Sequence, residues 1–196
     1  MLEDTFSKSN LELDKTSHLR RDMTAMKDKL LEKKQGELVK MKLRELLLPH
    51  GFFRTKPSFY TRLYEDRIEF IHLHKLTSGP FYRVHTGIRF LLDDLDYVDL
   101  NGIQANGYKN EYSIHYNFRY HKDEDSILRC ANQILLFVEN EAIPWFNIWR
   151  YEDVLYTRQD SPLRKELVYK YNMLKKENKE NAEIIFKSKK LLGIKE

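Results

Sequence analysis

Apolar residues recur at spacings of three and four in the N-terminal quarter of the chain. This period is typical of amphipathic helices, because about 3.6 residues complete one turn. It predicts a helix over residues 16–34, a break or bend at 35–36, and a second helix over 37–48. Proline and glycine within residues 49–51 should end the second helix. The stripe of the first helix consists of Leu19, Met23, Met26 and Leu30.

The hydrophobic period then changes to two. Alternating apolar and polar side chains, rich in aromatic and β-branched residues, are typical of half-buried strands. Short turn sequences at 65–66 and 77–80 separate the first three of these segments. Four strands are predicted, over residues 58–64, 67–76, 81–92 and 112–120.

Helical patterns return after the fourth strand. Asp123 is placed as the N-cap of a helix that runs to about Asn140. Ser161-Pro162 is a typical helix start, and the tail from there to Leu192 should also be helical. Helices, an antiparallel meander and further helices, in that order, predict an α+β fold with helices covering the sheet.

This order predicts three parts in the chain. Residues 1–36 form an N-terminal tail and helix, residues 37–157 an α+β core domain, and residues 158–196 a basic C-terminal helical extension. The extension should pack on the chain itself or on a partner, through apolar residues at helical spacing. These residues are Leu163, Leu167, Tyr171 and Leu174, with a shorter stripe of Ile185, Leu191 and Leu192.

The region from about residue 38 to 157 resembles a bacterial family known as domain of unknown function 4304. The motifs that carry the resemblance are Gly51-Phe52, Phe59-Tyr60 with Arg62, Ile71 to Lys75, Phe81 with Gly87-Ile88, and Ile143-Pro144-Trp145-Phe146. One departure is that His74 stands before Lys75 where the family has glutamine. The family has no assigned activity, so the resemblance implies a fold and a bacterial origin but no function.

The turn at 77–80 predicts how the second and third strands pair. If Leu76 faces Phe81, then His72 faces His85 and His74 faces Arg83. The core face then holds Ile71, Leu73, Val84, Ile88 and Phe90. The opposite face gathers His72, His74, Arg83, His85 and Arg89, and the fourth strand could extend it with His115, Asn117 and Arg119.

Three interpretations of this polar face stay open. Three imidazoles about 5–7 Å apart are compatible with a bound metal, but the arginines would repel a divalent cation and Glu69 points to the other face. Arginine and histidine on one sheet face suit an anion better, such as a phosphate or an acidic loop of a partner. The third interpretation is a solvated sheet face without a ligand. The sequence indicates no catalytic residue, metal or cofactor.

Other candidate sites have plainer explanations. Cys130, the single cysteine, lies on the apolar stripe of its helix, which indicates a buried structural thiol. The four aspartates within residues 93–99 do not have the spacing of a calcium loop and read as an acidic surface loop. Trp145 and Trp149 lie four residues apart, which favours core packing over an aromatic ligand platform. No nucleotide-binding or hydrolase motif is present.

Composition and charge limit the kinds of partner. Apolar residues make up 41% and aromatic residues 13% of the 196 positions, so most of the chain should fold. The net charge of +4 is uneven, because residues 161–196 hold ten Lys and Arg against five Glu while the centre is mildly acidic. A nucleic-acid binder would carry its basic patch on the folded platform, so nucleic acid is disfavoured. Neither a signal peptide nor a membrane span is apparent, which suggests a cytoplasmic protein.

Two function classes follow from these observations. The first is a non-enzymatic binding domain that presents the Arg/His face to an anionic ligand or acidic partner, with an immunity-type role as a special case. The second is a small hydrolase or transferase, metal-dependent in one version, that uses His72, His85 or His115 beside Arg83 or Arg89. The sequence favours the first. The most buried residues should include Leu73, Val84, Ile88, Ile114, Ile134 and Val138.

Overall fold

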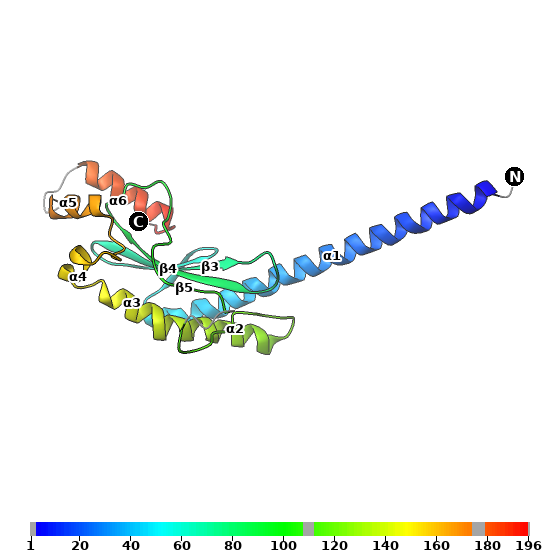
Figure 1. Cartoon of the computed structure of the whole chain (residues 1–196), viewed down its shortest axis with the longest axis horizontal. Coiled ribbons are helices and arrows are strands. Elements are labelled where there is room, and N and C mark those ends of the chain that lie inside the picture. Colours follow the sequence, from blue (N-terminus) through cyan, green and yellow to red (C-terminus); the bar gives the residue numbers. More distant parts are fainter. Residues whose placement is uncertain (1–2, 108–111, 174–178, 196) are drawn as a thin grey trace.

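The chain forms an α+β fold with an antiparallel sheet, as the sequence predicted, but the sheet has five strands where four were predicted, and it lies between helices. The computed structural model describes residues 3–107, 112–173 and 179–195. The strands are β1 (Phe53–Lys56), β2 (Phe59–Leu63), β3 (Arg67–Lys75), β4 (Tyr82–Phe90) and β5 (Gln104–Ala105). They follow one another in the sheet in chain order, so each pairs with its sequence neighbour. In Figure 1 the helices α1, α2 and α3 lie on one side of this sheet and α6 on the other.

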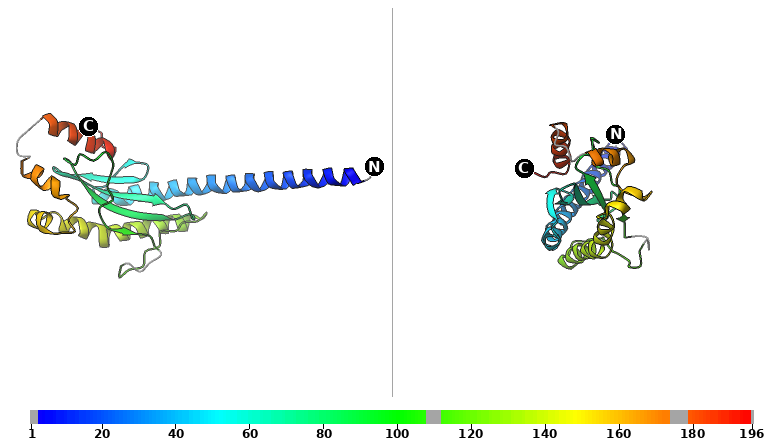
Figure 2. Two further views of the ribbon diagram at one scale, coloured as in Figure 1. Left: turned by 45° about the horizontal axis from the view of Figure 1, so that its top comes forward. Right: turned by 90° about the vertical axis from the view of Figure 1, so that its left-hand side faces the viewer.

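The N-terminal region is one continuous helix, α1 (Glu3–Leu47), and not two. Its N-terminal half projects away from the rest of the molecule, whereas its C-terminal half packs on the sheet (Figures 1 and 2). The predicted break at 35–36 is wrong. Gly36 instead allows a close approach, because a Cβ atom there would lie 2.7 Å from the Tyr82 hydroxyl oxygen. That hydroxyl donates a 2.9 Å hydrogen bond to the Gly36 carbonyl oxygen, which ties the helix to the sheet.

The segment predicted as the fourth strand, residues 112–120, does not form one. Its end makes a single bridge to the sheet, between Phe81 and Arg119. Before that bridge the segment lies beside α2, where the Asn117 N–H donates to the Gln133 side-chain oxygen. The short strand β5 takes the place beside β4. As a consequence Ile114 is 38% exposed, and its assignment to the core is wrong.

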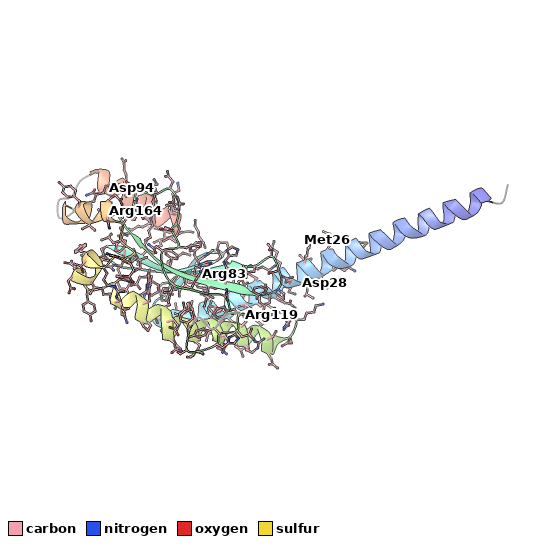
Figure 3. All side chains as sticks on the ribbon, viewed as in Figure 1. Met26, Asp28, Arg83, Asp94, Arg119 and Arg164 are labelled. Carbon is pink, nitrogen blue, oxygen red and sulfur yellow. The ribbon has the colours of Figure 1, made fainter. Side chains whose placement is uncertain are left out.

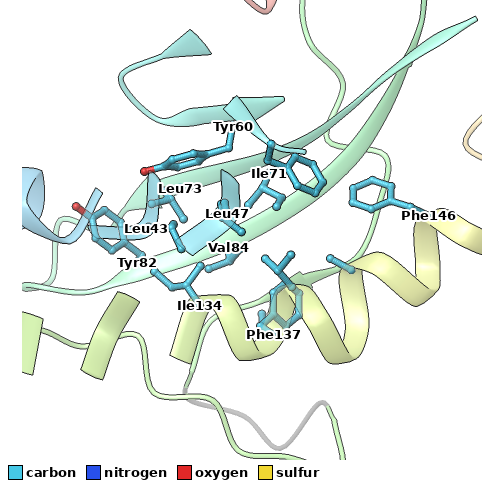
Figure 4. Close-up of a cluster of buried hydrophobic side chains, with 14 of the residues drawn as sticks. Leu43, Leu47, Tyr60, Ile71, Leu73, Tyr82, Val84, Ile134, Phe137 and Phe146 are labelled. Carbon is cyan, nitrogen blue, oxygen red and sulfur yellow. The ribbon is translucent and has the colours of Figure 1, made fainter. Parts of the chain in front are cut away.

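The main core lies between the sheet and the helices α1, α2 (Glu124–Phe137) and α3 (Ile143–Ile148), with a π-helical turn, Val138–Ala142, between the last two. Figure 4 shows this packing around Leu43, Leu73 and Ile134. Asp123 caps α2 as predicted, accepting a 2.7 Å hydrogen bond from the Ser126 N–H. The other predicted core residues are confirmed as buried: Leu73, Val84, Ile88, Ile134 and Val138.

Cys130 and Trp149 belong to this core. Cys130 is fully buried and its thiol lies 3.2 Å from the Phe118 carbonyl oxygen, so it is a structural residue as predicted. Burial raises the pKa of this thiol to about 12. Trp149 is buried as well, and the ring of Trp145 packs against it with the centroids 6.1 Å apart.

The C-terminal part is helical and packs on the chain itself, which confirms one of the two predicted alternatives. It contains α5 (Lys165–Met173) and α6 (Lys179–Leu191), and the short helix α4 (Glu152–Thr157) precedes it at the end of the predicted core domain. Leu163 and Leu167 are buried in the main core, whereas the side chains of Tyr171 and Leu174 lie outside the described residues. Leu192 packs with Ile68 and Phe70 on the second face of the sheet. The extension therefore covers part of the face on which the histidines were predicted.

Candidate functional site

The strands β3 and β4 pair in the register that their turn predicted. His72 lies opposite His85, and His74 lies opposite Arg83. Facing side chains of antiparallel strands are close neighbours, and the three imidazole rings form a compact group. The ring centroids are 5.9 Å apart for His72 and His85, 6.1 Å for His74 and His85, and 6.3 Å for His72 and His74.

An aromatic side chain from β2 completes this group. Phe59 pairs with His72 across the two strands, and the rings stack with their centroids 4.3 Å apart. Phe59 was not predicted as part of this face, although the short turn at 65–66 places it beside His72. We call the set Phe59, His72, His74, Arg83 and His85 the histidine face. Figure 3 labels Arg83 on the sheet.

Arg89 shares this side of the sheet but is not accessible there, which corrects its assignment as a binding residue. It is 2% exposed because α6 covers it. Its guanidinium donates to the carbonyl oxygens of Asp93, Leu95 and Tyr97 at 2.6–2.8 Å, and to the Ser188 hydroxyl at 3.1 Å. Arg89 therefore fastens the loop after β4 and the helix α6 to the sheet.

The two candidates from residues 112–120 lie in different surroundings. His115 is exposed, but the residue opposite His85 on the neighbouring strand is Gln104 and not His115. The expected extension of the face by His115 thus fails, because the part of this segment that carries His115 does not pair with the sheet, and its single bridge is at Arg119. Arg119 is also exposed, and its guanidinium carbon lies 5.5 Å from the centre of the Phe81 ring. Since Phe81 precedes Arg83 by two positions, Arg119 borders the histidine face.

Three polar atoms of the histidine face are buried without a hydrogen-bond partner among the residues that the structure describes. They are His72 Nδ1, His85 Nε2 and Arg83 Nε. Such atoms are rare in folded proteins, because each loses its hydrogen bonds to water on burial. Either imidazole can adopt the tautomer that carries the proton on that nitrogen. The patch therefore contains three N–H-capable atoms that have no acceptor among the described residues.

The two central histidines are held in their neutral form. Burial, together with smaller contributions from the neighbouring His85 and His74, lowers the pKa of His72 to about 4. Burial likewise lowers the pKa of His85 to about 4, with Arg83 and His74 as the next contributions. At neutral pH these imidazoles act as hydrogen-bonding groups, and Arg83 supplies the positive charge of the face.

These pKa values predict a stability loss in mild acid. In the unfolded chain a histidine titrates near pH 6.5, so between about pH 6.5 and 4 the unfolded state binds more protons than the folded state. Stability should be complete above this window and fall as the pH drops through it. Urea unfolding midpoints between pH 7 and pH 4 would measure the loss, which a double variant, His72→Gln with His85→Gln, should largely remove.

The carboxylate Asp94 loses its contribution in a separate, lower window. Hydrogen bonds from Lys170 and Arg164 hold the pKa of Asp94 at about 2, below its ordinary value of 3.8. Its stabilising effect is therefore present above pH 3.8 and is lost toward pH 2. An unchanged slope between pH 6.5 and 4 in the double histidine variant would contradict the assignment to His72 and His85.

Among the described residues, no carboxylate forms a hydrogen bond or ion pair with the three histidines of this face. Glu69 points to the opposite face, as predicted, and is buried there in an ion pair with Arg62. Throughout the described residues, no group of three or more His, Cys, Asp or Glu side chains is arranged to hold a metal ion. The chemistry that the face supports directly is hydrogen bonding to an acceptor beside one fixed positive charge.

Comparisons of the chain with models of protein families, with curated proteins and with solved structures gave no match. The resemblance to the domain of unknown function 4304 family therefore stays a prediction. Within residues 3–107, 112–173 and 179–195, no helix has both the length and the apolar character needed to cross a membrane. The function has to be inferred from the residues of the site.

Proposed function

We propose that this protein is a binding domain. Its histidine face binds an oxyanion, which is a carboxylate or phosphate group of a ligand or of an acidic partner. The observation that carries the proposal is the set of three buried N–H-capable atoms without a partner, on His72, His85 and Arg83. An oxyanion has several acceptor lone pairs and can satisfy more than one of them at once. Arg83 makes no ion pair among the described residues, so its charge is available to a ligand.

Several features favour a binding role over the hydrolase or transferase that the sequence left open. Two residues of that alternative are not available, because Arg89 is buried and engaged by four acceptors and His115 is not opposite His85. Arg83, His72 and His85 remain together, but the pKa values of both histidines, about 4, lie well below the range of an efficient general base at neutral pH. A cytoplasmic bacterial setting and an immunity-type role stay predictions within this proposal.

Imidazole NMR signals of the full chain, titrated with inorganic phosphate and separately with acetate, test the proposal. The signals of His72 and His85 should move, and their pKa values should rise from about 4, because a bound anion stabilises the protonated ring. Added salt should weaken binding. Arg83→Gln should weaken it by about tenfold, since a charged hydrogen bond contributes roughly 1.5–3 kcal/mol.

The matched control is Lys42→Gln, which removes an exposed positive charge from α1 outside this face. It should leave the affinity within about twofold, because exposed charges contribute little. Equal weakening by both variants, or shifts that spare His72 and His85, would refute the proposal. Tight stoichiometric binding of Zn²⁺ at the three histidines would instead support the metal interpretation.

A further inference from the structure

A second surface lies where α1 leaves the body of the molecule. There α1 and the turns at the end of the sheet enclose an open groove of about 1320 Å³. Lys75 lines the groove and follows His74 directly on β3. Because neighbouring side chains on a strand point to opposite faces, the groove and the histidine face lie on opposite sides of the sheet. Six lysines line the groove: Lys27, Lys29, Lys33, Lys34, Lys40 and Lys75.

The positive charge of the groove is only partly neutralised. Its two glutamates are occupied, since Glu32 pairs with Lys75 at 2.6 Å and Glu37 pairs with Arg54 at 2.5 Å. The hydrogen bond from Arg54 lowers the pKa of Glu37, which keeps that carboxylate ionised. Four exposed lysines, Lys27, Lys29, Lys33 and Lys34, make no ion pair with any described residue. The groove therefore attracts negative charge.

Exposed apolar side chains accompany these lysines along α1. Met23, Met26 and Leu30 are 60%, 75% and 69% exposed, and they follow one another at helical spacing. Leu30 also lines the groove, so the stripe runs from the groove outward along the projecting helix. Figure 3 places Met26 on the part of α1 beyond the body. Exposed apolar stripes beside charge are typical of protein-binding surfaces, and methionine adapts to varied partners.

We propose that this groove and stripe dock an acidic amphipathic helix of a partner protein. The surface from Met23 to Lys34 is a straight helical edge of about 17 Å, at about 1.5 Å per residue. A second helix lying along it could place its apolar side against Met26 and Leu30 and its carboxylates near the four lysines. This is the helix-in-groove mode of recognition, in which apolar anchors recur every three or four residues.

The same residues fit other occupants less well. The two aromatic rings that line the groove, Tyr82 and Tyr120, are 1% and 0% exposed, so they cannot stack against the bases of a nucleic acid. A membrane surface requires a broader apolar face than a stripe one residue wide. A second copy of this chain would bring the same four lysines, and like charges repel. An acidic helix complements both features of the surface.

Fluorescence anisotropy with the full chain tests this docking. The probe is a labelled peptide of about 20 residues, or about five helical turns, with leucine at heptad positions a and d and glutamate and alanine elsewhere. It should bind, and added salt should weaken the complex. The double variant Lys29→Glu with Lys33→Glu should weaken binding by about tenfold or more, and Leu30→Ser should weaken it comparably, because each removes roughly 1.4 kcal/mol or more.

Control variants lie outside the groove and the stripe. Lys42→Glu changes an exposed lysine of α1, and Phe186→Ser changes a 51% exposed phenylalanine of α6 on the other side of the sheet; both should leave the affinity within about twofold. Circular dichroism should be the same for all variants, because every changed side chain is solvent-exposed. The histidine-face variant Arg83→Gln should also leave peptide binding intact, which separates this inference from the proposed function.

Several outcomes would overturn the docking proposal. One is an absence of peptide binding. Another is equal binding of a peptide with the same composition in scrambled order, which would show that binding depends on charge alone and not on the spacing of the leucines. Tighter binding of single-stranded DNA, or of vesicles of anionic lipid, through the same lysines would assign the groove to that ligand. Self-association in sedimentation velocity that Leu30→Ser abolishes would assign the stripe to a second copy.

Discussion

Replacing Arg89 with methionine is expected to lower the free energy of unfolding by about 3–5 kcal/mol, the usual cost of breaking a buried charged network. Methionine keeps much of the volume but donates no hydrogen bonds. The carbonyl oxygens of Asp93, Leu95 and Tyr97 would then lose their donor in a region that α6 covers. Urea unfolding followed by far-UV circular dichroism measures the loss, and hydrogen exchange should show increased opening of α6.

The control for Arg89 is Arg158→Met. Arg158 also forms an ion pair with an aspartate, Asp160, at 2.6 Å, but both side chains are about half exposed. Exposed pairs contribute about 0–1 kcal/mol, so this variant should be close to wild type. If Arg89→Met costs no more than Arg158→Met, Arg89 does not fasten α6 and the loop, and the histidine face extends further than described.

Replacing Arg62 with methionine should be comparably costly, at about 3–5 kcal/mol near neutral pH. Its guanidinium pairs with Glu69, which is fully buried, and lies 4.5 Å from the centre of the Phe52 ring. Burial raises the pKa of Glu69, and the charge of Arg62 opposes that rise. Without Arg62 the Glu69 carboxylate must either take up a proton or remain charged and unpaired inside the protein.

A double variant separates the pair from its parts. Arg62→Met together with Glu69→Gln removes both charges, so most of the lost stability should return. The cost of Arg62→Met alone should also shrink as the pH falls, because protonation of Glu69 removes the unpaired charge. Unfolding free energies of the two single variants and the double variant measure this coupling. A double variant no more stable than Arg62→Met would show that the packing of Arg62 matters more than its charge.

The pairing of β3 with β4 could be predicted from sequence because its determinants are local. The turn at 77–80 fixes which residues face each other, and a slip of one position would put His72 and Arg83 into the core. The same alternation identified Leu73, Val84 and Ile88 as core residues. The N-cap at Asp123 was equally readable, since it depends on residues within one helical turn.

The failures concern features that depend on contacts between distant segments. Gly36 reads as a helix breaker in isolation, but the hydroxyl of Tyr82, 46 positions later, makes it a place of close approach. Residues 112–120 alternate like a strand, yet β5 pairs with the edge of β4, and the segment forms a hydrogen bond with α2. The local hydrophobic pattern gives no information on which of two segments pairs with the edge of a sheet.

The sequence by itself determined the α+β class, the central register and the side of the sheet on which the histidines lie, because periodicity and short turns encode them. Only the tertiary structure decided how that side is divided. The helix α6, about 100 positions after β4, covers Arg89 and leaves the histidine face with its unpartnered nitrogens. The tertiary structure also decided that α1 projects as one helix and forms a lysine-lined groove. The burial of a helix face depends on what packs against it and not on its own sequence pattern.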